Sequence, residues 1–106
     1  QELKAANIWL RENSNEEDII LSSAVPQTTY YAQRRTFGIG FENEEELFEK
    51  LKEIKPGYLE LSLFEKSPDF IYGVPQKYPE KFTPVYAAFS DPENKNLILG
   101  IYKINI

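Results

Sequence analysis

Apolar residues near the start of the chain recur every three or four positions, which is the spacing of one face of an α-helix. This stripe predicts a helix over residues 2–13, and its members are Leu3, Ala6, Trp9 and Leu10. The polar run 13–15 ends the helix, because Asn and Ser side chains bond the local backbone in competition with it. The next apolar run, 19–21, is continuous, which is typical of a strand covered on both faces, so we expect a central strand over 18–23.

A second helix is predicted from Pro26, since proline suits the first helical turn, where its missing N–H has no partner to lose. Ser23 or Ala24 precedes it, and a serine cap is expected there. Two faces of this helix differ in character, and the pattern leaves open which one is buried. One face carries Gln27, Tyr30, Tyr31 and Arg34, and the other carries Thr28, Ala32 and Arg35. Residues 36–39 then predict a short edge strand, closed by Gly40.

The third helix, Glu44–Ile54, has the clearest signals in the chain. Asn43 is its expected N-cap, and Glu46 completes a capping-box pattern three residues later. Its apolar face is followed by Pro56 and Gly57, which stop a helix. Residues 58–64 then alternate between apolar and other side chains, as a strand does.

The last part of the chain predicts a β-hairpin. Residues 67–78 are irregular, with a short helix expected around 76–82. Strands are predicted over 85–89 and 97–104, joined by a turn-rich loop. From this order we predict a single α/β domain over residues 1–106, with three Rossmann-like layers. Its sheet should have about five mostly parallel strands, closed by a C-terminal antiparallel hairpin.

Composition narrows the function classes. The net charge of −5 argues against a nucleic-acid partner and against docking on anionic lipid, because both require a basic surface. Histidine and cysteine are absent, which removes thiolate nucleophiles, histidine acid–base catalysis and ordinary zinc sites. We therefore expect no metal, no cofactor and no catalytic residue in this domain. No apolar run approaches the ~20 residues that cross a bilayer. The chain has no methionine and starts with Gln1, so we expect a processed chain or a piece excised from a longer protein.

The turn between the first strand and the second helix is one candidate ligand site. Ser22, Ser23, Gln27 and Thr28 surround a helix start, where backbone N–H groups can cradle a phosphate or sugar hydroxyls. Helix capping explains the same serine and threonine residues more simply. The pair Gly38 and Gly40 lacks the remainder of a nucleotide-binding fingerprint.

A polar-aromatic cluster on the second helix is the other candidate. Tyr30 and Tyr31 could stack on sugar faces, and Arg34 and Arg35 could pair with phosphate. The alternative is that one tyrosine packs on the sheet while the arginines pair with local carboxylates, and we favour it because such side chains often cover core edges.

The isolated carboxylates of the chain are weaker candidates for a catalytic or metal-binding site. Glu60 and Ser62 lie on the less apolar side of a predicted strand, but a lone carboxylate lacks the second group that acid–base hydrolysis needs. We expect Glu60 to be solvated or paired with a lysine. The acidic turns 13–18 and 91–94 lack the spacing of a calcium loop.

Several short motifs together carry a resemblance. The helix A-x-x-W-L-x-x-N covers Ala6–Asn13, and P-Q-x-x-Y-Y-x-x-R-R-T covers Pro26–Thr36. P-x-Y-L-E-L follows at Pro56–Leu61, then F-x-x-V-Y at Phe82–Tyr86 and I-Y-K-I at Ile101–Ile104. In this combination, nearly the whole chain resembles the C-terminal soluble domain of archaeal and bacterial membrane glycosyltransferases of the dolichyl-phosphate-mannose protein mannosyltransferase-like group.

The resemblance implies a location and a set of partners. In that group the domain lies on the extracytoplasmic face of the cell membrane, above a membrane module that binds a lipid-phosphate sugar and holds the catalytic acids. For this chain it implies a non-catalytic domain of a glycosyltransferase, which packs on the transmembrane module of its parent or shapes access of donor or acceptor. Expected partners are that module, a lipid-phosphate sugar and a glycan or protein acceptor. The rival hypothesis is a free-standing α/β enzyme, or a phosphate- or sugar-binding module, that uses the turn at Ser22–Thr28.

Overall fold

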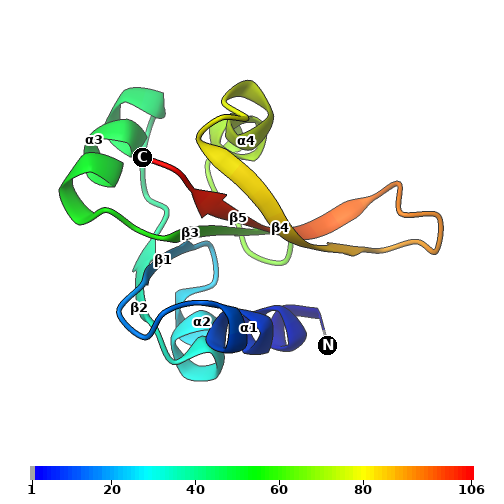
Figure 1. Cartoon of the computed structure of the whole chain (residues 1–106). Helices are drawn as coiled ribbons and strands as arrows, with labels where there is room; N and C mark the ends of the chain where they lie inside the picture. The colour runs from blue at the N-terminus through cyan, green and yellow to red at the C-terminus, as the bar shows by residue number, and fades with distance from the viewer. Residues whose placement is uncertain (1) are drawn as a thin grey trace.

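The computed structural model describes residues 2–106 of the chain, which form one five-stranded mixed sheet with helices on both faces (Figure 1). The helices are α1 (Glu2–Asn13), α2 (Val25–Ala32), α3 (Glu44–Ile54), a 3₁₀ turn (Asp69–Gly73) and α4 (Val74–Lys77). The strands are β1 (Ile19–Ser22), β2 (Arg35–Gly38), β3 (Tyr58–Ser62), β4 (Phe82–Phe89) and β5 (Leu97–Ile104). Their order across the sheet is β2-β1-β3-β5-β4.

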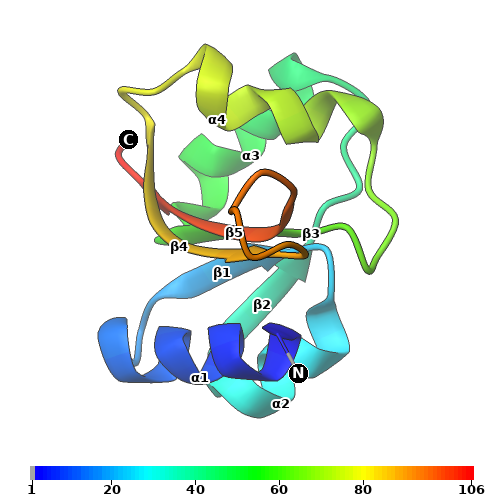
Figure 2. The ribbon, with the colours of Figure 1, turned by 90° about the vertical axis from the view of Figure 1, so that its right-hand side faces the viewer.

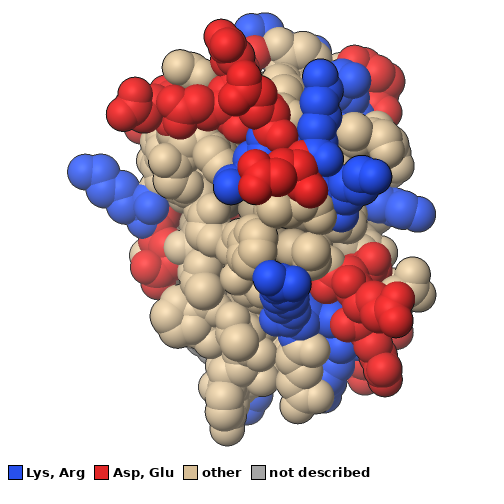
Figure 3. Space-filling model, turned by 90° about the vertical axis from the view of Figure 1, so that its left-hand side faces the viewer, with Lys and Arg blue, Asp and Glu red and all other residues tan. Residues whose placement is uncertain are grey.

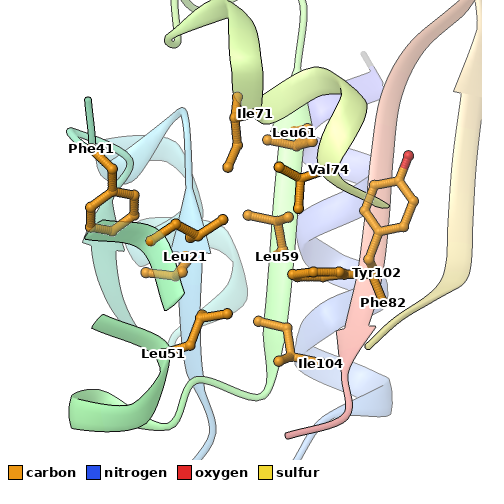
Figure 4. Close-up of a cluster of buried hydrophobic side chains, with 11 residues drawn as sticks. Leu21, Phe41, Leu51, Leu59, Leu61, Ile71, Val74, Phe82, Tyr102 and Ile104 are labelled. Carbon is orange, nitrogen blue, oxygen red and sulfur yellow. The ribbon is translucent and has the colours of Figure 1, made fainter. Parts of the chain in front are cut away.

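Two helical layers enclose the sheet. Figure 2 shows α1 and α2 on one face and α3 and α4 on the other. Each face has its own apolar cluster: Leu3, Leu10 and Ile20 belong to the α1–α2 side. The α3–α4 side is larger, and Figure 4 shows side chains from β1, β3, β5 and both helical segments meeting there, among them Leu21 and Leu59. All five residues of β3 are buried, because the strand is central and covered on both faces.

The predicted Rossmann-like, mostly parallel sheet is wrong. β1 pairs in parallel with β2 and β3, but β5 pairs antiparallel with both β3 and β4, through longer ladders. β4 runs in the same direction as β3, yet the two never pair, because β5 inserts between them. The terminal hairpin thus contributes a central strand rather than simply closing the edge of the sheet. Pro84 explains the choice of edge, since proline cannot donate to a ladder and is confined to outer strands.

The helix ends show where local signals sufficed. The Asn43 side chain caps α3 by accepting the N–H of Glu46 at 3.0 Å, as predicted. The serine cap predicted for α2 is wrong: its N-cap is Ala24, with no side-chain bond, and Ser22 turns inward instead. The short helix lies earlier than predicted, over 69–77, where Glu44 of α3 bonds both Lys77 and Tyr78. No helix within residues 2–106 is long and apolar enough to cross a membrane.

Candidate functional site

The turn that follows β1 contains a buried polar cluster. Ser22 and Thr28 are both buried, and their hydroxyl oxygens lie 2.9 Å apart. Both hydroxyls also bond Oε1 of Glu60 on the neighbouring strand β3, at 2.9 Å from Ser22 and 2.6 Å from Thr28. The register that aligns Ser22 with Glu60 places this carboxyl under the start of α2. The side chains of Ser22 and Thr28 therefore bond Glu60, which the sequence analysis expects to be solvated or paired with a lysine.

Glu60 is the main surprise of the cluster. It is fully buried rather than solvated or lysine-paired, so that expectation is wrong. Burial raises the pKa of the Glu60 carboxyl, and the bonds from Thr28 and Ser22 only partly oppose that rise. Its Oε2 atom has no hydrogen-bond partner among residues 2–106, and neither has the amide of Asn7, which is buried in α1 on the same side of the sheet. A cluster closed to solvent in this way ties β1, β3 and α2 together.

Ser23 and Gln27 are less deeply placed than their neighbours. The Ser23 hydroxyl accepts the backbone N–H of Ser62 at 3.1 Å, which joins the loop after β1 to the end of β3. Gln27 is half-buried on α2. Of the four residues predicted at this turn, the structure brings Ser22 and Thr28 together and gives Ser23 a separate structural bond. Ligand binding by the turn stays a prediction, and in this arrangement the two buried hydroxyls are occupied by Glu60.

The second candidate cluster is divided between three parts of the fold: Tyr30 and Tyr31 lie on α2, Arg34 lies in the turn after it, and Arg35 begins β2. Thr28 and Ala32 are the buried residues of α2, which answers the question that the pattern left open. Tyr30 is 74% exposed and meets the half-buried Tyr31 edge-on, with ring centroids 4.9 Å apart. Lys4 of α1 lies over the Tyr31 ring at 5.5 Å. These two rings form a small aromatic surface beside α1. Arg34 and Arg35 make their contacts in other parts of the fold.

Arg34 is a structural residue in this fold. Only 8% of it is exposed, and its guanidinium donates five hydrogen bonds. Four go to the carbonyl oxygens of Arg11, Ser14, Ala32 and Gln33, and one goes to the Ser14 hydroxyl. It therefore joins the end of α1 to the turn after α2, and its partners are four carbonyls and one hydroxyl rather than the carboxylates that the alternative interpretation expected.

Arg35 differs from its neighbour. It is exposed on the edge strand β2, and its guanidinium lies 5.3 Å from the centre of the Phe37 ring. Such a contact stabilises weakly at an exposed site. Of the two arginines, only Arg35 is free to meet a partner without breaking internal bonds.

A cavity at the opposite end of the sheet was not predicted. It has a volume of about 760 Å³ and lies where β1 and β3 begin and where α3 and β5 end. Polar groups line part of its wall: Asn13, Asn15, Asp18, Lys52, Lys55 and Lys103. Apolar side chains, including Leu51 and Ile104, line the rest. No sequence signal brought these residues together, because α1, α3 and β5 are far apart in the chain.

Acidic side chains are sparse in the wall of the cavity. Within the described range 2–106, no group of three or more acidic side chains is placed to hold a metal ion. Asp18 provides the single acidic side chain among the residues that line the cavity, and its Oδ2 accepts the backbone N–H of Asn15 at 2.8 Å. The surrounding lysines and amides are suited to hydrogen bonding and to anions rather than to divalent cations.

Comparison with known proteins identifies a fold but not a family. No protein-family model matches the chain, and no curated protein matches it. Among solved structures, the C-terminal globular domain of an oligosaccharyltransferase from Archaeoglobus fulgidus is similar, with a TM-score of 0.61 over 96% of each chain. Sequence identity between the two is 11%, so the similarity establishes a shared fold alone.

Proposed function

We propose that this chain is a non-catalytic domain of a membrane-bound glycosyltransferase that uses a lipid-phosphate sugar. In this role it packs on the transmembrane module of its parent, on the extracytoplasmic face, or shapes access of the donor or acceptor. The observation that carries the proposal is the whole-chain structural similarity to an oligosaccharyltransferase C-terminal domain. That similarity agrees with the motif resemblance, which points to membrane glycosyltransferases from the sequence side.

The chemistry of the described residues supports an accessory role. Among residues 2–106, the one fully buried carboxylate is Glu60, which is enclosed with two hydroxyls and does not face the cavity. The residues that line the cavity include one acidic side chain, whereas acid–base hydrolysis of a glycosidic bond uses a positioned pair. Sugar transfer would therefore depend on groups in another part of the parent protein.

The rival hypothesis of a ligand site at Ser22–Thr28 has less support. A ligand at that turn would have to replace the bonds of Ser22 and Thr28 to Glu60, leaving a buried carboxyl without partners. Titration of residues 1–106 with phosphorylated sugars, followed at the Ser22–Thr28 amides, separates the hypotheses: saturable shifts centred there favour the rival.

The native gene product provides the test of the accessory role. An antibody against residues 1–106 should detect a protein much larger than 12.3 kDa in the membrane fraction of the source cells. That protein should resist extraction with alkaline carbonate, and the epitope should be open to protease added outside intact spheroplasts. A band of about the size of this chain in the soluble fraction would contradict the proposal.

A further inference from the structure

The cavity at the start of β1 and β3 collects positive charge in an acidic protein. The chain has 17 acidic and 12 basic residues, yet three lysines and one aspartate line this cavity. Lys52 and Lys55 come from the end of α3, while Lys103 comes from β5. On the side of the molecule where α3 lies in Figure 1, basic side chains spread over the middle and right of the surface, between acidic groups (Figure 3).

Lys52, Lys55 and Lys103 form no salt bridge with a carboxylate among residues 2–106. The salt bridges among residues 2–106 join Lys50 to Glu53, Lys77 to Glu44 and Lys95 to Glu93, and include none of the three. Asp18 already accepts a backbone N–H, as described above. The cavity therefore holds more cationic than anionic side chains, without internal neutralisation by salt bridges.

Helix chemistry explains only part of this arrangement. Lys52 and Lys55 suit the negative end of the α3 dipole and would be favourable there without any ligand. Lys103 has no such reason, because it lies on a strand, between Tyr58 and Thr83 in the register. Its neighbours Tyr102 and Ile104 belong to the α3–α4 side, so Lys103 is on the α1 side of the sheet. Lys52 and Lys55 from the α3 end and Lys103 from the α1-facing side of β5 thus line one cavity around the end of the sheet.

The remaining wall is suited to a larger ligand than a bare ion. The cavity has a volume of about 760 Å³, which falls in the range of small-molecule sites. Asn13 and Asn15 are exposed and carry amides, which can both donate to and accept from hydroxyl groups. The exposed side chain of Ile106 and the edge of Ile104 provide an apolar surface beside them.

We propose that this cavity binds a phosphorylated polyol such as a sugar phosphate, with the phosphate at Lys52, Lys55 and Lys103 and the hydroxyls at the asparagines. Lysine is a common point-charge partner of phosphate. The same chemistry occurs in a free sugar phosphate and in the headgroup of a lipid-linked sugar. The choice of a mannosyl and lipid-linked ligand rests on the proposed function, but either can fail alone, because the inference concerns binding by residues 1–106 and not membrane attachment.

Binding is measured on residues 1–106 by NMR titration with mannose 1-phosphate, with mannose and inorganic phosphate as separate ligands. Saturable shifts are expected for amides around the cavity with mannose 1-phosphate, and weaker binding with either part alone. Lys52→Gln, Lys55→Gln and Lys103→Gln should each raise the dissociation constant about fivefold or more, as expected for loss of a charge-assisted bond. All three side chains are exposed, so the substitutions should leave the fold intact, which circular dichroism checks.

Lys50→Gln is the matched control, since it removes the same charge from the same helix outside the cavity. It should change the dissociation constant less than twofold. No saturable shift with mannose 1-phosphate, or equal weakening by all four variants, would overturn the proposal. Inorganic phosphate binding as tightly as mannose 1-phosphate would overturn the polyol part.

A parallel flotation assay uses phosphatidylcholine vesicles with and without dolichyl phosphate mannose. Lysine-dependent flotation only with the mannosyl lipid supports a lipid-linked source. Binding of mannose 1-phosphate without flotation supports a free one. Flotation that the three substitutions leave unchanged would contradict a role of the cavity in lipid recognition.

Discussion

Replacing Arg34 by methionine should destabilise the domain severely, although a sugar-phosphate role for the residue would predict no such effect. The substitution keeps a flexible apolar side chain but removes the guanidinium and its five hydrogen bonds. Two of the lost bonds go to Arg11 and Ser14 carbonyls at the end of α1, where helical carbonyls lack intrahelical partners. The contact between α1 and the turn after α2 therefore depends on this one side chain.

The magnitude follows from counting gains and costs. A hydrogen bond contributes about 0.5–1.5 kcal/mol net, so five such bonds contribute roughly 2.5–7.5 kcal/mol. Removing a buried charge also recovers its desolvation cost, and water can reach part of the site, which places the expected loss near the lower limit. We predict a loss of about 2–4 kcal/mol in the free energy of unfolding. This is a large share of the about 5–15 kcal/mol that stabilises a typical domain.

Urea unfolding followed by Trp9 fluorescence measures this loss, and a thermal melt should show a midpoint lowered by roughly 10 °C or more. Arg35→Met is the matched control, because it makes the same change at the next residue. Arg35 is exposed and makes one cation–π contact, so its loss should cost at most about 1 kcal/mol. Equal stability of the Arg34 and Arg35 variants would refute the structural assignment of Arg34.

Three further changes test other parts of the fold. Burial raises the pKa of Glu60 in the folded protein. The stability that Glu60 contributes is therefore fully present below the pKa of Glu60 in the unfolded chain, and it is lost as the pH rises through the pKa in the folded protein. The chain has no histidine, so the free energy of unfolding should fall from pH 5 to pH 8, and Glu60→Gln should flatten that slope; an unchanged slope would contradict the burial argument. Asn43→Ala removes the cap of α3 and should cost about 1 kcal/mol by urea unfolding, whereas Glu45→Ala, exposed in the same helix, should cost less; equal losses would argue against the cap. The pKa of Asp91 is lowered by backbone N–H bonds from Asn96 and Lys95, so its contribution is lost as pH falls through the folded value, and Asp91→Ala should loosen the hairpin loop in hydrogen exchange at pH 7; protection equal to the wild type would contradict this.

Elements defined by neighbouring residues were predictable from the sequence. The bounds of α3 and the cap at Asn43 match, because amphipathic spacing, capping and the Pro-Gly stop all act within a few residues. The helix over 2–13 was found for the same reason. The same local signals misled at α2, where a serine beside a helix start was expected to cap it and instead bonds Glu60.

Long-range pairing explains what the sequence did not reveal. The position of β5 between β3 and β4 depends on pairing between segments about forty residues apart in the chain, and alternation within a strand does not specify its neighbour. One local signal was available, since Pro84 argues for an edge position of β4. Glu60 was expected in solvent because Ser22 and Thr28, its partners, are 38 and 32 residues away. The cavity lysines likewise come together only after β5 has paired with β3.

We propose above that the chain is a part of a membrane glycosyltransferase that does not perform the transfer chemistry itself. The most direct measurement is transfer of labelled sugar from a lipid-phosphate donor to acceptor, comparing membranes that contain the full-length parent protein with purified residues 1–106. The account predicts transfer by the parent and none by residues 1–106 above a protein-free control. Sugar transfer by residues 1–106 alone, or no transfer by the parent with any lipid-phosphate sugar, would contradict it.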